Sequence, residues 1–122
     1  MRRKLLLLPL LLLLGCTKNY VNHPGSIDAL DSHVYDQLIT IHSVIETSKA
    51  DLAANKFPAA ISANVKTSLN DLIRAYDALD AAYLSYHASV GMPTAAQVQA
   101  VNAAVGQVQS AQSALTSARG GK

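Results

Sequence analysis

Apolar side chains recur at three- and four-residue steps along most of the chain. The first run begins at Ile27, has Ser48 in its one missing place, and consists of Ile27, Leu30, Val34, Leu38, Ile41, Ile45 and Leu52. This spacing lays one apolar stripe along a helix, because a helix has 3.6 residues per turn. Ser26 is a suitable N-cap, and Asn55 in "NKFP" is a suitable stop. We therefore predict a helix over residues 26–54.

Two further stripes predict two further helices. The second stripe consists of Ile61, Val65, Leu69, Leu72, Tyr76, Leu79, Tyr83, Tyr86 and Val90. Pro58 suits the first turn of this helix and Gly91 in "GMP" suits its end, which gives residues 58–90. The third stripe, with Gln112 in one slot, consists of Val98, Val101, Val105, Val108 and Leu115. It follows the capping-box sequence "TAAQ" and predicts a helix over residues 94–118.

Three long helices joined by short connections predict an all-α fold. No segment alternates apolar and polar residues with period two for long enough to form a strand. Connections this short join antiparallel neighbours, so the helices should run up, down and up. We therefore expect an up-down-up, three-helix antiparallel bundle over residues 26–119.

The second stripe carries the tyrosines Tyr76, Tyr83 and Tyr86. The third predicted helix is rich in Ala, Gly and Val, and small residues opposite large ones interdigitate in a core. We therefore expect the three rings to pack against the third helix. Candidate partners for their hydroxyls are Asn102, Gln109 and Ser110. The alternative is that the same rings line a ligand slot.

The segment before the first helix has a different pattern. Three basic residues precede an apolar run of about ten residues, which is followed by Gly15 and Cys16. A charged start, a short apolar run and a small residue are the layout of a secretory signal. A membrane-spanning helix needs roughly 20 apolar residues, more than this run supplies. We therefore expect residues 1–15 to be a cleaved signal peptide and residues 16–25 to be a flexible tether that begins at the cysteine.

The sequence "LLGC", Leu13 to Cys16, resembles the lipobox of bacterial lipoproteins: an apolar residue stands three places before the cysteine and a small residue directly before it. The resemblance implies cleavage after Gly15 and a diacylglyceryl thioether on Cys16. Two or more acyl chains hold a protein firmly at a membrane. The alternative is an ordinary signal peptide with an incidental cysteine, which leaves the one cysteine of the chain without a partner.

The same resemblance implies a location in the bacterial cell envelope. An Asp directly after the lipidated cysteine is associated with retention at the inner membrane, and this chain has Thr17 there. We therefore expect a protein anchored to the outer membrane and facing the periplasm. The body resembles small helical lipoproteins, and this likeness implies no activity.

The charge balance changes when the signal peptide is set aside. The chain has ten basic and eight acidic residues, a formal net charge of +2. Three basic residues lie in the predicted signal, so seven basic and eight acidic residues remain and the net charge becomes −1. A nucleic-acid-binding surface needs clustered Lys and Arg, which this sequence does not show. We expect no nucleic-acid partner.

Histidines and acids gather near the end of the bundle that the tether enters. Imidazole and carboxylate groups are typical metal ligands, but no H-x-x-x-H spacing occurs on a helix face. We therefore expect surface pairs there, His33 with Asp80, and a similar pair, His42 with Asp71, farther along. The alternative is a metal or ligand site at this end, and its metal candidates are His33, His87, Asp28 and Asp80.

No motif of a known catalytic mechanism is present. The sequence lacks G-x-S-x-G, H-E-x-x-H, a Gly-rich phosphate loop and the C-x-x-C-H of covalent haem. We expect neither an enzyme nor a cofactor. The third predicted helix is nearly uncharged on every side, which suits contact with a protein or a glycan; the alternative is an Ala-rich helix without a partner. The expected function is therefore a lipid-anchored envelope protein with a structural or protein-interaction role, and its rival is a periplasmic ligand- or metal-binding bundle.

Overall fold

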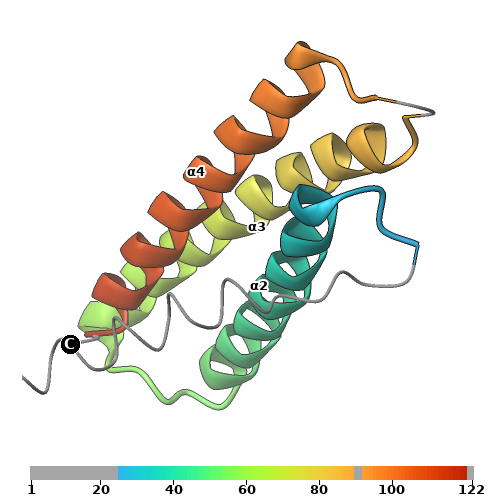
Figure 1. The fold of residues 1–122 in the computed structure, drawn as a ribbon. Coiled ribbons are helices and arrows are strands. Elements are labelled where there is room, and N and C mark those ends of the chain that lie inside the picture. Colours follow the sequence, from blue (N-terminus) through green and yellow to red (C-terminus); the bar gives the residue numbers. More distant parts are fainter. Residues whose placement is uncertain (1–24, 90–91, 121–122) are drawn as a thin grey trace, which may run out of the picture.

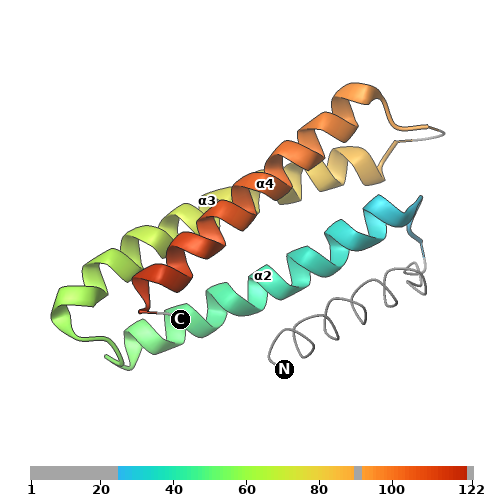
Figure 2. The ribbon, with the colours of Figure 1, turned by 60° about the vertical axis from the view of Figure 1, so that its left-hand side comes forward.

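A computed structural model shows three helices that run up, down and up as one antiparallel bundle (Figure 1 and Figure 2). The structure describes residues 25–89 and 92–120. The helices are α2 (Ala29–Ala53), α3 (Ala59–His87) and α4 (Ala95–Ala118), and these ranges contain no strand. The predicted all-α, three-helix bundle is confirmed. The predicted signal peptide, the lipid site and Gly91 lie outside the described residues.

Side-chain hydrogen bonds cap the N-termini of α2 and α4, and the sequence correctly predicted the cap of α4 but not that of α2. The Thr94 Oγ1 accepts the Gln97 N–H at 3.1 Å, and the Gln97 Oε1 accepts the Thr94 N–H at 2.8 Å, so the predicted capping box is confirmed. The cap of α2 is Asp28, whose Oδ1 accepts the Asp31 N–H at 2.9 Å. The predicted cap Ser26 is therefore wrong, because a carboxylate two residues later lies at the positive end of the helix dipole.

The turn between α2 and α3 begins at Asn55, as the sequence predicted. Asn55 has a φ of 54°, in the left-handed region that Asn tolerates better than most residues. Its N–H donates to the Leu52 carbonyl at 3.1 Å, and the Lys56 N–H donates to the Asp51 carbonyl at 3.0 Å. These two bonds form a Schellman motif, which satisfies carbonyls that the end of a helix leaves without partners.

The core lies along the inner faces of the three helices. Its buried members are Val34, Leu38, Ile41 and Ile45 from α2; Val65, Leu69, Leu72, Ala75, Leu79 and Tyr86 from α3; and Val101, Ala104, Val108 and Leu115 from α4. Only the two alanines fall outside the predicted stripes. The backbones of α3 and α4 approach each other along more of their length than those of α2 and α3, and α2 and α4 barely meet. Helix α3 is therefore the central element of the bundle.

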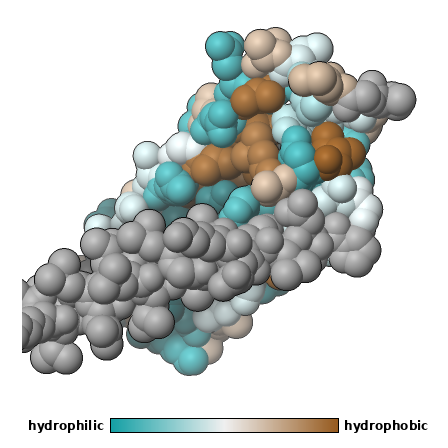
Figure 3. All heavy atoms as spheres, in the orientation of Figure 1, coloured by the Kyte–Doolittle hydropathy of each residue, from teal (hydrophilic) through white to brown (hydrophobic). Residues whose placement is uncertain are grey.

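Apolar side chains also reach the surface at the end of the bundle where α2 begins. Ile27, Leu84 and Met92 have exposed fractions of 40%, 57% and 91%, and they flank the start of α2, the end of α3 and the start of α4. Figure 3 shows apolar residues in the part of this face where the beginning of α4 lies. No helix in the described part of the chain is both long and apolar enough to cross a bilayer.

At the opposite end, Arg119 links α4 to α2. Ser48, the polar residue in the α2 stripe, is fully buried, and its Oγ accepts a hydrogen bond from Arg119 Nη1 at 2.8 Å. Arg119 Nη2 donates to Asp51 Oδ2 at 2.8 Å, and the guanidinium lies 5.4 Å from the ring centroid of Phe57. The buried hydroxyl is therefore satisfied by a residue far along the chain, which explains why the stripe tolerates a serine.

Replacing Arg119 should loosen this end of the bundle. Arg119→Ala leaves the buried Ser48 hydroxyl without its donor and exposes Phe57, so we expect the free energy of unfolding to fall by about 1–2 kcal/mol. Urea unfolding of a soluble form that begins at residue 17 measures this loss. The matched control is Arg74→Ala, because Arg74 is exposed on α3 and should change stability by less than about 0.5 kcal/mol. If the two variants lower the free energy of unfolding equally, Arg119 does not stabilise this end of the bundle.

Candidate functional site

An open groove of about 360 Å³ lies between α2 and α3. It is lined by Tyr35, Leu38 and Ile39, and by His42, Tyr76, Asp80 and Tyr83. Tyr35 and Ile39 are exposed at the rim, whereas Tyr76 and Tyr83 are half-buried in the wall. The volume and the mainly apolar and aromatic lining are typical of small-molecule sites. We refer to this feature as the aromatic groove.

The rings of the aromatic groove come alternately from the two helices. Tyr35 of α2 and Tyr83 of α3 have centroids 6.4 Å apart at an interplanar angle of 48°, and His42 and Tyr76 have centroids 6.1 Å apart at 41°. Tyr83 also stacks on His87, with a centroid distance of 5.5 Å and an angle of 28°. Tilted and offset arrangements of this kind are favoured between aromatic rings. The rings therefore hold one another in place along the interface.

The prediction that Tyr76, Tyr83 and Tyr86 find their partners on the third helix is wrong, because the ring and hydroxyl partners that the structure shows on another helix belong to α2. Tyr76 and Tyr83 contact rings of α2, and the Tyr86 hydroxyl donates to Asp28 at the start of α2. Carboxylates at that end of α2 are stronger hydrogen-bond acceptors than the amides of α4. The alternative that tyrosines line a slot matches the placement of Tyr76 and Tyr83, although Tyr86 lies in the core.

Burial and neighbouring acids act together on the phenols of the groove. Burial raises the pKa of Tyr83 to about 12, and the hydrogen bond with Asp31 and the charges of Asp31 and Asp80 act in the same direction. Burial also raises the pKa of Tyr76, to which the charges of Asp80 and Asp77 contribute. Both phenols are therefore neutral at physiological pH and lie in a negative electrostatic field.

A buried carboxylate closes the bundle at the end of the groove. Asp31 is fully buried; its Oδ2 accepts the Ile27 N–H at 3.0 Å and lies 2.6 Å from His87 Nδ1. Burial alone would raise the pKa of Asp31, but the hydrogen bonds from Ile27, His87 and Tyr83 outweigh it and hold this pKa below its ordinary value. The other oxygen, Oδ1, has no hydrogen-bond partner of standard geometry in the part of the chain that the structure describes.

Tyr86 forms a second link beside this pair. Its hydroxyl donates to Asp28 Oδ2, and Asp28 Oδ1 at the same time caps α2. Burial, the hydrogen bond with Asp28 and the charges of Asp28 and Asp31 raise the pKa of Tyr86 to about 12. The two acids at the start of α2 therefore join this helix to the end of α3. Asp31 holds Nδ1 of His87, whose side chain is 41% exposed.

The structure places the four metal candidates in different surroundings. His87 pairs with Asp31, Asp28 binds Tyr86, Asp80 lines the aromatic groove, and His33 is exposed on α2. No group of three or more His, Cys, Asp or Glu side chains among residues 25–89 and 92–120 could hold a metal ion. The candidates therefore share no metal site. The predicted pair of His33 with Asp80 is not among the ion pairs of the residues that the structure describes.

The predicted pair of His42 and Asp71 is not formed. His42 contacts Tyr76 instead, while Asp71 lies beside α4 in a second groove. The reason is register: α2 and α3 are shifted along each other by more than a helical turn from the pairing expected for their short connection. The same shift brings Asp31 to His87.

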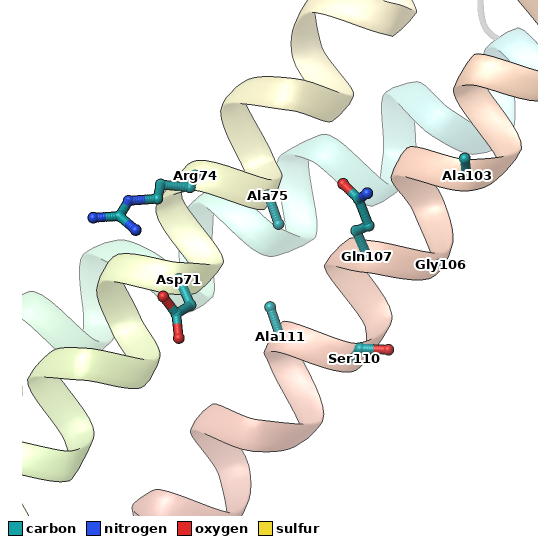
Figure 4. A pocket seen from close by; sticks show the side chains of 8 residues that line it. All are labelled: Asp71, Arg74, Ala75, Ala103, Gly106, Gln107, Ser110 and Ala111. Carbon is teal, nitrogen blue, oxygen red and sulfur yellow. The ribbon is translucent and has the colours of Figure 1, made fainter.

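The second groove, of about 800 Å³, runs between α3 and α4 and is broad and open. Its lining is Asp71, Arg74 and Ala75 from α3, and Ala103, Gly106, Gln107, Ser110 and Ala111 from α4. In Figure 4, Ala75 and Ala111 point into the space between the helices, whereas the Arg74 side chain points away from α4. A Cβ placed on Gly106 would meet no atom within 4 Å, so this glycine is not required for packing. We call this feature the α3–α4 groove.

Sequence reasoning missed the α2 side of the aromatic groove. Tyr35, Ile39 and His42 form a second stripe at positions i, i+4 and i+7, beside the main stripe of the same helix. That spacing is the signal in the sequence that could have identified the α2 side of the groove.

Comparisons with protein-family models, with curated proteins and with solved structures found no match to this chain.

Replacing the buried carboxylate should change both stability and its dependence on pH. Asp31→Asn removes the charge that accepts these hydrogen bonds, so we expect a loss of about 1–3 kcal/mol near neutral pH. Because the pKa of folded Asp31 lies below its ordinary value of 3.8, its contribution is fully present above that pH. It is lost as the pH falls through the lower folded-state value, so the wild type should lose stability there more steeply than the variant.

Urea unfolding at a series of pH values, from neutral down to about pH 2, measures both effects. The matched control is Asp71→Asn, which removes an exposed carboxylate of α3 and should alter neither. A variant with the same stability and the same acid dependence as the wild type would show that Asp31 does not hold the start of α2.

Proposed function

We propose that this protein is a lipid-anchored component of the bacterial cell envelope. Support comes from the sequence: a charged start, an apolar run of about ten residues and "LLGC" precede the segment "TKNYVNHPG", which has no apolar periodicity. Acyl chains on Cys16 would hold the body at the membrane surface. We further propose that it faces the periplasm from the outer membrane, because Thr17 follows the cysteine.

The body of the protein acts, in this proposal, by contact with a protein partner through the α3–α4 groove. The observation that carries it is that α4 has no charged residue from Ala95 to Ala118, although one of its sides is open to solvent. Uncharged surface costs less to remove from water than charged surface, and charged residues are depleted at the centre of protein interfaces. Gln107 and Ser110 in the groove supply hydrogen-bonding groups without charge. The role is therefore binding, without catalysis or a cofactor.

The lipid is tested by intact mass. Full-length protein from bacterial membranes should have lost residues 1–15 and gained the mass of a diacylglyceryl group, with a further acyl chain if the new amino terminus is modified. Cys16→Ser should give an unprocessed and unmodified chain, because the thiol is the acceptor of the lipid. The control Ser26→Ala keeps the cysteine and should keep the lipid. An unmodified thiol in processed wild-type protein would overturn the anchor.

The contact surface is tested by crosslinking in native membranes. Gln107→Glu places a charge in the α3–α4 groove. The amount of crosslinked partner should fall about tenfold, because a partner that covers the groove would bury this charge without a counter-charge. Gln109→Glu makes the same change on another side of α4, outside this groove, and should retain the partner. If the two variants recover equal amounts of crosslinked partner, the α3–α4 groove is not the contact surface.

A further inference from the structure

We propose that the aromatic groove between α2 and α3 binds a small quaternary ammonium ligand. The groove combines three features that such a ligand requires: aromatic faces, a carboxylate, and a wall free of basic side chains that are always charged. The aromatic rings and the carboxylate belong to exposed or half-buried residues, so a molecule in solution can reach them.

The aromatic faces come from both helices. Tyr35 and His42 project from α2, and Tyr76 and Tyr83 project from α3 into the same groove of about 360 Å³. The face of an aromatic ring carries negative charge density and attracts a cation that lies over it. The tilts of 41° and 48° between the paired rings mean that their faces are not parallel, so they can surround one cationic group from several sides.

Asp80 supplies the charge. It lines the groove, is half-buried, and acts on the phenols of both Tyr76 and Tyr83. Neither Lys nor Arg lines the groove, and Asp80 has no ion pair among residues 25–89 and 92–120. The carboxylate is therefore available to a cation from outside the protein.

The size and the lining favour a quaternary ammonium over a primary amine. Leu38 and Ile39 add apolar surface beside the rings, and this surface offers no hydrogen-bond acceptors for an N–H group. A primary ammonium could direct only some of its N–H groups to Asp80 and would lose the hydration of the others against Leu38 and Ile39, whereas methyl groups on nitrogen bury favourably against apolar and aromatic side chains. The groove should therefore distinguish the two kinds of cation.

The test is a titration of the full, lipidated chain in a non-ionic detergent, followed through the ring signals of the tyrosines by NMR. The probe is choline. Its neutral isostere, 3,3-dimethylbutan-1-ol, has the same shape without charge, and ethanolamine has the charge on a primary ammonium. We expect choline to shift the Tyr76 and Tyr83 signals and to bind at least tenfold more tightly than either of the other two compounds.

Two variants locate the site. Tyr76→Leu removes an aromatic face but keeps an apolar side chain, and Asp80→Asn removes the charge; each should weaken choline binding by at least fivefold, since cation–π contacts contribute about 1 kcal/mol or more. Asp71→Asn removes one negative charge from the α3–α4 groove and should leave binding unchanged. Circular dichroism confirms that each variant is folded, and a second replacement, Tyr76→Met, substitutes for Tyr76→Leu if the latter unfolds.

Three results would overturn the proposal. The first is no shift of the tyrosine signals with choline at concentrations up to about 10 mM, where even a millimolar ligand would saturate. The second is equal binding of choline and its neutral isostere, which would make the groove merely apolar. The third is equal binding of choline and ethanolamine together with an unchanged affinity in both groove variants, which would indicate a nonspecific ionic contact elsewhere.

Discussion

The difference in side-chain size between the two sides of α3 determines the arrangement of the bundle. On the side of α4, α3 presents the buried Ala75 opposite the half-buried Ala111, and the two backbones lie close together. On the side of α2, it presents Tyr76 and Tyr83, whose rings need more space. The backbones of α2 and α4 approach each other at few points, and grooves remain open between α2 and α3 and between α3 and α4.

Polar contacts at the two ends of α2 compensate for its less extensive packing. At one end, Asp31 and Asp28 bind side chains from the end of α3; at the other, Arg119 reaches from the end of α4 to Ser48. Each contact joins residues more than fifty positions apart in the sequence. Buried polar groups with specific partners fix the position of a helix along its neighbours more sharply than interchangeable aliphatic side chains do. The register of α2 therefore depends on its ends, and the aromatic groove between them depends on that register.

The sequence was sufficient to predict the elements, because local rules determine them. The spacing of Val34, Leu38 and Ile41 shows which side of α2 is buried, and "TAAQ" and Asn55 mark helix ends through contacts within a few residues. Periodicity identifies an apolar side of a helix but does not say which neighbour it meets. The orientation of the tyrosines was therefore predicted wrongly, and the Arg119 contact was not foreseen at all. The proposed lipid on Cys16 rests on the sequence alone.

The central claim is that α3 divides its side chains by size, with the tyrosines toward α2 and the small residues toward α4. Nuclear Overhauser contacts of the tyrosine ring protons test it most directly. We expect contacts from the Tyr83 ring to the Tyr35 ring and from the Tyr76 ring to the His42 ring, since the centroids of these pairs lie 6.4 and 6.1 Å apart. Contacts from the same rings to Asn102 and Gln109 of α4, without those to α2, would contradict it.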